Sequence, residues 1–355
     1  MQYIIGIVVI MLYSGITFYI GRNVQIWLST ISIQIPQLLF WPVLYFIAFS
    51  FLLARAHSTL KPLSVIGNYW MFVFQYGLLL CIVANIVVYV TPLSSKVVGS
   101  GAIILFIILF IVGTYNAYSP VVREITLKAD VSEPLTIVVA SDFHLGLLSH
   151  KNHLKKFVDL SNAQEPDAVL LVGDLVDDDP LWFVSKGMGE VMAQLQTTYG
   201  VYGVVGNHEY YGKKIPLLVH EMEQANVKIL LDETIVVGER FYLTGREDKT
   251  NGNRLPLEEL APENSDLPWF VMNHTPDDIQ TPANLGVNFH VSGHTHLGQL
   301  WPNNFITDKV FELDYGYKNK EGMHALVSSG FGFWGPPMRI GSRSELWVVK
   351  MEPAQ

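Results

Sequence analysis

The first 120 residues contain no aspartate or glutamate, and this limits what the chain can fold into more than any other feature. The charged side chains there are Arg22, Arg55, Lys61 and Lys96. A soluble domain has no reason to exclude carboxylates over such a length. A segment inside lipid hydrocarbon does, because each charge placed there costs about 3 kcal/mol or more. The sequence therefore excludes a purely soluble protein.

This region contains four apolar runs, and each is close in length to the roughly 20 residues that a helix needs to cross a bilayer. A buried helical core would also be apolar, but it would not lack carboxylates. The chain start, Met1-Gln2-Tyr3, has no positive charge, so we expect the first run to be retained rather than cleaved as a signal. We expect residues 1–120 to form a transmembrane region with four helices and residues 121–355 to form a polar domain. The four runs are Tyr3–Ile20, Ile35–Ala54, Tyr69–Val90 and Val97–Tyr115.

The basic residues near the ends of the spans predict their orientation, because Lys and Arg favour the cytoplasmic side. With four spans, the N-terminus, the loop after the second span and the polar domain share one side. That side has the larger number of basic residues: Arg55, Lys61, Arg123 and Lys128, against Arg22 and Lys96 opposite. The polar domain is therefore expected in the cytoplasm of an integral membrane protein.

The remainder of the chain is acidic. It holds all 32 acidic side chains and 19 of the 23 basic ones, a net charge of −13. This balance disfavours a nucleic-acid partner, which needs a basic face. The single cysteine, Cys81, lies in an apolar run, so the polar domain has no disulfide, cysteine zinc module or cysteine nucleophile.

From Leu135 onward, short β-branched runs alternate with helix-like stretches, which is typical of a layered α/β domain. The expected helices are His153–Asn162, Val184–Thr197 and Lys214–Gln224. The expected strands are Leu135–Ala140, Ala168–Val172, Val201–Val205, Trp269–Met272 and Phe289–Val291.

Side chains able to bind metal follow each of these five strands, where function collects in α/β folds. Taken alone, most of these clusters have an ordinary structural explanation, such as a capped turn or a solvated acidic loop. Gly293-His294-Thr295-His296 is the strongest, because two imidazoles directly after a strand suit a metal better than a core. In chain order the clusters are Asp142 and His144, then Asp174, then Asn207 and His208, then His274, then His294 and His296.

Joined in this order, the clusters read D-x-H, G-D-x-x-D, G-N-H-E, H and G-H-x-H, and the sequence resembles the calcineurin-like metallophosphoesterases from about Leu135 to Glu345. The resemblance implies a two-sheet β-sandwich flanked by helices, with a binuclear metal centre at one edge. It also implies that His208 is no ligand but faces the phosphate. The implied ligands are Asp142, His144 and His296 for one metal, Asn207, His274 and His294 for the second, and Asp174 as a bridge.

Such a site would hydrolyse a phosphoester or pyrophosphate. Two divalent cations can clamp phosphate oxygens and acidify a bridging water until hydroxide forms near neutral pH. Carboxylate, amide and imidazole ligands suit Mn²⁺, Fe or Zn²⁺ without selecting among them. His208, when protonated, can stabilise the developing charge or protonate the leaving oxygen.

The segment Gly330–Pro337 with Arg339 resembles the glycine-rich C-terminal segment of the membrane-linked branch of this family, which includes enzymes that cleave UDP-diacylglucosamine. The first hypothesis is therefore hydrolysis of a lipid-linked substrate. The alternatives are the same chemistry on a soluble nucleotide or cyclic nucleotide, and a sensor that binds phosphate without turnover.

The same segment contains Phe331, Phe333 and Trp334, which we expect to form an aromatic cluster with Trp301. These rings are either local core or a lip at the mouth of the active site that dips into the bilayer interface.

Overall fold

The computed structural model describes residues 2–264 and 266–354, and the chain forms two compact units. The first unit comprises Met1–Thr114 and Gly335–Met338, and the second comprises Tyr115–Trp334 and Arg339–Gln355.

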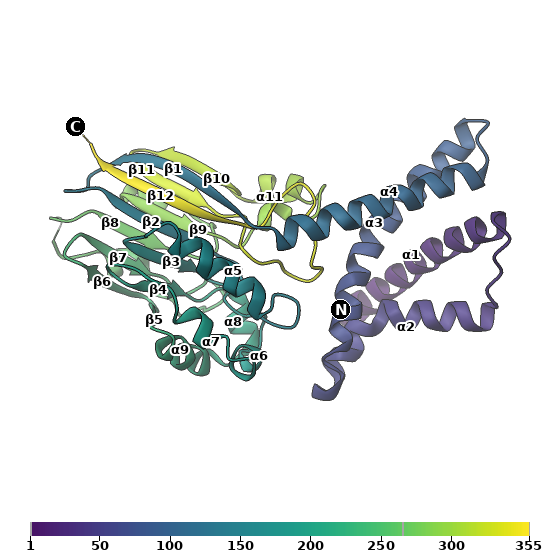
Figure 1. The fold of residues 1–355 in the computed structure, drawn as a ribbon, viewed down its shortest axis with the longest axis horizontal. Helices are drawn as coiled ribbons and strands as arrows, with labels where there is room; N and C mark the ends of the chain where they lie inside the picture. The colour runs from purple at the N-terminus through teal and green to yellow at the C-terminus, as the bar shows by residue number, and fades with distance from the viewer. Residues whose placement is uncertain (1, 265, 355) are drawn as a thin grey trace. The chain divides into compact units, whose positions relative to one another are not determined.

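The first unit contains four helices long and apolar enough to cross a membrane (Figure 1). All four predicted spans correspond to helices. Three of these helices are longer than their apolar runs, whereas α2 has the length of its run but begins and ends two residues later. A short 3₁₀ helix, η1 (Ser58–Leu60), lies between the second and third helices. The bounds are α1 (Gln2–Thr30), α2 (Gln37–Ala56), α3 (Leu63–Val90) and α4 (Ser95–Tyr118).

Helices α2 and α3 approach closely at Gly67. A Cβ atom added there would lie 2.8 Å from the backbone nitrogen of Phe51, so only glycine permits this contact. In a membrane the lipid is as apolar as the side chains, so the hydrophobic effect does not drive helices together. Small residues such as glycine instead let two helices approach closely enough for van der Waals contact.

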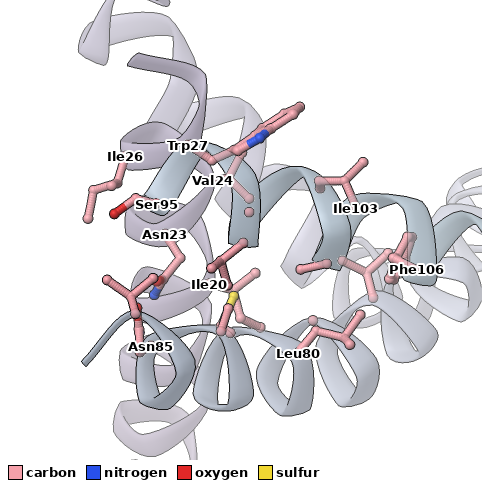
Figure 2. Close-up of a pocket in the computed structure, with 18 residues that line it drawn as sticks. Ile20, Asn23, Val24, Ile26, Trp27, Leu80, Asn85, Ser95, Ile103 and Phe106 are labelled. Atoms are coloured by element: carbon pink, nitrogen blue, oxygen red, sulfur yellow. The ribbon is translucent and has the colours of Figure 1, made fainter. Parts of the chain in front are cut away.

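An apolar cavity of about 290 Å³ lies between α1, α3 and α4 (Figure 2). Asn85 lines it and donates a hydrogen bond of 2.7 Å to the hydroxyl of Tyr19 on α1. Trp27 Nε1 bonds Ser100 Oγ on α4 at 3.2 Å. These polar groups therefore join helices to one another.

The second unit is built on two six-stranded sheets. The strand order in the first is β1 (Val121–Ala129), β12 (Glu345–Pro353), β2 (Leu135–Ala140), β3 (Ala168–Val172), β4 (Val201–Val204) and β5 (Val227–Ile229). In the second it is β10 (Gly316–Lys320), β11 (Met323–Val327), β9 (Phe289–Ser292), β8 (Trp269–Met272), β7 (Phe241–Gly245) and β6 (Glu233–Val237). Strands β2 to β5 are mutually parallel, as are β7, β8, β9 and β11.

In the central strands the side chains alternate between two apolar layers. In β2, Ile137 and Val139 belong to the cluster that joins the two sheets, whereas Val138 and Ala140 pack in the cluster that includes the helices of the first sheet. Those helices are α5 (Lys151–Asn162), α7 (Gly189–Met192) and α9 (Ile215–Gln224). A third apolar cluster contains residues of η2 (Leu257–Leu260) and of β8 and packs against α10 (Gln280–Asn284). The predicted sandwich flanked by helices is confirmed.

One predicted helix is wrong. The stretch Val184–Thr197 is not a single helix but contains the end of α6 (Leu181–Ser185), then α7, then turns. Gly187 between the two helices has a φ of 58°, a left-handed conformation that ends a helix.

Candidate metal centre

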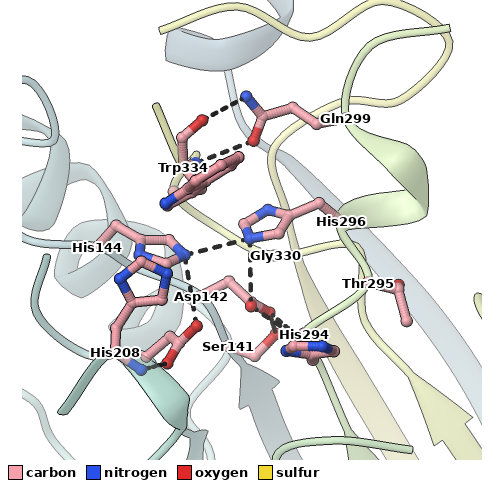
Figure 3. A network of polar contacts seen from close by, with 12 residues as sticks. Ser141, Asp142, His144, His208, His294, Thr295, His296, Gln299, Gly330 and Trp334 are labelled. Carbon is pink, nitrogen blue, oxygen red and sulfur yellow. Dashed lines mark hydrogen bonds and ion pairs between the residues drawn. The ribbon is translucent and has the colours of Figure 1, made fainter. Parts of the chain in front are cut away.

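The predicted site residues follow closely after the ends of parallel neighbouring strands. Those after β2, β3 and β4 leave one sheet, and those after β8 and β9 leave the other, so the carboxyl ends of both sheets contribute to one site. Figure 3 shows His144, His296 and Asp142 converging, with His208 and His294 beside them. Of the seven predicted ligands, six are buried and His294 is half-buried.

The ligand loops have strained backbones. Five of the predicted ligands adopt positive φ: Asp142 (54°), His144 (44°), Asp174 (50°), His294 (71°) and His296 (51°). Such conformations cost about 1–3 kcal/mol each and persist only where the surroundings impose them. Gly293 leaves room for this arrangement, because a Cβ atom there would lie 2.4 Å from Asp142 Oδ2. Their concentration at one edge indicates a functional site.

The first group joins Asp142, His144 and His296, whose ligand atoms lie within 4.8 Å of one another. The Nε2 atoms of His144 and His296 are 3.1 Å apart, and His296 Nε2 is 3.4 Å from Asp142 Oδ1. The backbone N–H of His294 donates to Asp142 Oδ1 at 3.0 Å, which holds the carboxylate in place.

The second group joins Asp174, His274 and His294, again within 4.8 Å. Asn207 completes it, with its Oδ1 2.9 Å from His294 Nδ1. His274 Nδ1 donates to the carbonyl oxygen of Val172 at 2.8 Å, so Nε2 is the ring nitrogen that faces the group. Burial would lower the pKa of His274, but the charge of Asp174 outweighs it and raises the pKa well above its ordinary value.

Asp174 lies between the two groups. Its Oδ2 is 3.2 Å from His274 Nε2 and 3.7 Å from His144 Nε2, while Oδ1 accepts the backbone N–H of His208 at 2.9 Å. Burial alone would raise the pKa of this carboxyl, but the neighbouring His274 and His144 lower its pKa well below the usual range. Asp174 is therefore a carboxylate that faces both groups at once.

These residues fit two divalent cations. His274 Nε2 is buried and makes no hydrogen bond, although Asp174 Oδ2 lies 3.2 Å away, and the Nε2 atoms of His144 and His296 face each other at 3.1 Å. Imidazole nitrogens and a carboxylate buried this close together are typical of metal ligands. The donor set of oxygen and imidazole nitrogen without thiolate suits Mn²⁺, Fe or Zn²⁺.

His208 is the second residue of helix α8 (Asn207–Gly212), and its ring centroid lies 4.6 Å from that of His144. Its Nδ1 is 2.7 Å from Asp178 Oδ1. Burial would lower the pKa of His208, but the hydrogen bond to Asp178 and the charge of Asp174 outweigh it and raise the pKa to about 9. His208 is therefore a cation at neutral pH.

Two further residues support the site, and sequence reasoning gave them no role. Glu209 accepts backbone N–H groups from Asp174 (3.1 Å), Val176 (3.0 Å) and Gly206 (2.6 Å), which ties the loop after β3 to the loop after β4. The sequence feature that could have identified Glu209 is its position as the last residue of the G-N-H-E motif.

Arg339 is the second such residue, and it is fully buried. Its Nη2 donates to the carbonyl oxygens of Ser329 (2.6 Å) and Gly332 (2.7 Å) and lies 3.2 Å from His296 Nδ1. Arg339 thus fixes the loop that faces the His296 ring. The sequence feature that could have identified Arg339 is its position as a single arginine next to a glycine-rich segment.

Comparison with known proteins agrees with this geometry. Residues 135–298 match the family model described as calcineurin-like phosphoesterase. An uncharacterized metallophosphoesterase of Campylobacter jejuni is 31% identical over 261 residues, covering 70% of this chain and 68% of its own length. One from Helicobacter pylori is 30% identical, covering 66% of this chain and 64% of its own length.

A bovine relative is described as a transmembrane protein with a metallophosphoesterase domain. It is 30% identical over 281 residues, covering 71% of this chain and 62% of its own length. The present chain thus spans about two thirds of the length of these relatives. With this similarity and the converging ligand groups, the chain belongs to the calcineurin-like phosphoesterase family of metal-dependent phosphoester hydrolases.

Proposed function

We propose that the protein is a membrane-bound hydrolase that cleaves a phosphoester or pyrophosphate in a lipid-linked substrate resembling UDP-diacylglucosamine. Residues 1–120 serve as a transmembrane anchor, and residues 121–355 form the catalytic domain. The observation that carries the substrate class is the short connection between the two. Helix α4 ends at Tyr118 and strand β1 begins at Val121, so the link keeps the domain close to the lipid surface and raises the local concentration of lipid substrate.

The ligand assignment follows the two groups. Asp142, His144 and His296 would hold one cation. Asn207, His274 and His294 would hold the other, and Asp174, which faces both groups, would serve both. Bound there, two divalent cations supply Lewis acidity toward phosphate oxygens and a water acidic enough to attack phosphorus near neutral pH.

The other side chains orient the substrate and move a proton. His208, charged and held by Asp178, donates a hydrogen bond to the phosphate and a proton to the leaving oxygen, a contribution of about 10²–10⁴-fold. Glu209 keeps Asp174 and the Asn207–His208 turn at a fixed separation through its three backbone hydrogen bonds.

One observation favours the second candidate, a soluble nucleotide or cyclic nucleotide. Two exposed rings flank His208: Tyr211 has its centroid 5.4 Å from the imidazole, and Trp334 has its centroid 6.3 Å away. Exposed aromatic faces can stack a nucleobase as readily as they can contact an acyl chain.

A matched substrate panel separates the two candidates. Purified full-length protein with Mn²⁺ is offered a detergent-dispersed lipid pyrophosphate, a set of nucleotides and cyclic nucleotides, and a chromogenic phosphodiester. We expect the highest kcat/KM on the lipid. A higher kcat/KM on a nucleotide would transfer the assignment to the soluble substrate. Phosphate binding without turnover of any substrate would favour the sensor.

A further inference from the structure

A second cavity, of about 300 Å³, lies in the second unit and includes none of the predicted metal ligands. Its lining is mostly polar and contains two arginines. The residues that matter below are Asn116, Arg123, Ser342 and Arg343.

Arg343 is held in one orientation but lacks a counter-charge. Its Nε donates to the carbonyl oxygen of Ser119 at 2.8 Å, and its guanidinium lies over the ring of Tyr115, 5.1 Å from the centroid. Among the described residues, no carboxylate lies within ion-pair distance of Arg343, and neither terminal nitrogen donates a hydrogen bond to the protein. The fork of N–H groups is therefore preorganised and free.

The surrounding charges leave the cavity positive. Arg123 is neutralised by Glu345, with Nε 2.9 Å from Oε2. Arg339, which is fully buried, does not line the cavity but holds two residues that do. Its Nη1 donates to Ser342 Oγ at 3.2 Å, and its carbonyl oxygen accepts from Asn116 Nδ2 at 3.1 Å. The cavity is therefore lined by one neutralised arginine and one, Arg343, that has no carboxylate within ion-pair distance among the described residues, and this favours an anion.

The position of Arg343 along the chain indicates which anion. Tyr115 lies in the last turn of α4, and Ser119 directly follows that helix. The 24 residues of α4 rise about 36 Å, whereas the hydrocarbon core of a bilayer is about 30 Å thick. When α4 spans the membrane, its end therefore lies at the level of the lipid headgroups. The planar fork of arginine matches the oxygens of a phosphate group.

We propose that this cavity binds a phosphate group at a site separate from the metal centre, with Arg343 as its main contact and a membrane lipid headgroup as the source. The site goes beyond the proposed hydrolase function, because it needs neither the metal ions nor turnover.

Isothermal titration calorimetry on the full chain in neutral detergent tests this. EDTA is present throughout, so that metal ions cannot hold phosphate. The titrants are dihexanoyl phosphatidate, inorganic phosphate and zwitterionic dihexanoyl phosphatidylcholine. Binding of phosphatidate, weakened at least tenfold in Arg343→Gln, supports the site. Tighter binding of phosphatidate than of inorganic phosphate supports the lipid as the source, and the reverse order overturns that source.

Arg240→Gln is the matched control. Arg240 also lies over a tyrosine ring, that of Tyr199, but it has a carboxylate partner, with Nη1 3.2 Å from Glu133 Oε2. This variant should bind phosphatidate like the wild type. If Arg343→Gln does not fold, Arg343→Lys decides, because it keeps the charge and loses the fork, and we expect a severalfold weaker affinity. The site is ruled out if neither anion binds, or if the folded Arg343 variants bind as tightly as the wild type.

Discussion

Asp174 is the side chain on which both candidate metal groups depend. We predict that Asp174→Asn abolishes hydrolysis and lowers bound metal from two ions to about one or fewer, because an amide cannot neutralise two cations at once. Metal content by mass spectrometry and turnover of a chromogenic phosphodiester measure the two effects. Asp159→Asn is the control, because Asp159 is a surface carboxylate paired with Lys155 at 2.9 Å. Full activity in Asp174→Asn would eliminate the two-metal proposal.

His208 should behave differently from the ligands. We predict that His208→Ala keeps both metal ions and lowers kcat by about 10²–10⁴-fold, because the side chain acts on the phosphate and not on a cation. The same metal analysis and steady-state kinetics test this. Loss of an ion would instead reassign His208 as a ligand, an arrangement for which His144, Asp177 and His208 lie close enough.

At the level of single residues, the sequence predicted best the side chains that can bind metal and that follow the strands in a characteristic order. The seven predicted ligands came from five separate stretches, and the structure brings all of them to one edge. Glu209 and Arg339 were not assigned roles, although each lies in a segment that the sequence had singled out. Their partners are backbone groups, such as the N–H of Asp174 for Glu209 and the carbonyl oxygen of Ser329 for Arg339, and the positions of backbone groups depend on how the loops fold and not on residue type.

The loop from Gly330 to Trp334 shows how one element can combine two roles. Phe331 and Phe333 are buried, as the core interpretation expects, whereas Trp334 is 47% exposed and Trp301 is 50% exposed. Gln299 brackets the backbone of Trp334 with two hydrogen bonds, one from Nε2 to the carbonyl oxygen at 2.8 Å and one from the Trp334 N–H to Oε1 at 2.9 Å (Figure 3). The four aromatic residues are therefore divided between core and surface.

This division predicts opposite results for two neighbouring substitutions. Phe333→Ser should lower the melting temperature and reduce activity on every substrate, because loss of a buried aromatic ring costs about 3–5 kcal/mol. Trp334→Ser should leave the melting temperature unchanged and raise KM for the preferred substrate. Calorimetry and kinetics on a lipid and a small phosphodiester distinguish them. A large fall in melting temperature for Trp334→Ser would show that this ring also belongs to the core.

Elements with a strong apolar period were predictable, and the others were not. The five strands that precede the site are almost wholly buried, and their sequences are mainly apolar. Strand β10 (Gly316–Lys320) is polar along its length, and β1 (Val121–Ala129) carries charges on its exposed face. Such edge strands form because a partner pairs with them, and the partner can be far away in the chain.

At the scale of the whole molecule, the missing carboxylates indicated a membrane region before any motif was considered. The sequence did not predict which distant strands pair with each other. For example, β1 pairs in parallel with β12, and this pairing joins Val121 to Glu345. The assignment of residues 1–120 to a transmembrane region and of residues 121–355 to the catalytic domain stays a prediction.

The last prediction concerns the orientation of the protein in the membrane. The bounds of the four helices define which loops lie on each side. The loop of residues 57–62 and the segment after α4 lie on one side of a four-span protein, and residues 31–36 and 91–94 lie on the other. Arg55, Lys61, Arg123 and Lys128 favour the cytoplasm for the first side. We predict that green fluorescent protein fused after Gln355 in a bacterial host is fluorescent, and that alkaline phosphatase fused there is inactive.

The control fusion is placed after Ser94 in the short loop before α4, where the two reporters should give the reverse result. The charge argument is tested separately by Arg55→Gln combined with Lys61→Gln. These changes leave two basic residues on each side, so the bias disappears and we expect a mixed population. Active alkaline phosphatase at Gln355 in the unchanged chain would place the phosphoesterase domain outside the cytoplasm. The metal chemistry would be unaffected, but the substrate would then have to be a lipid of the opposite leaflet.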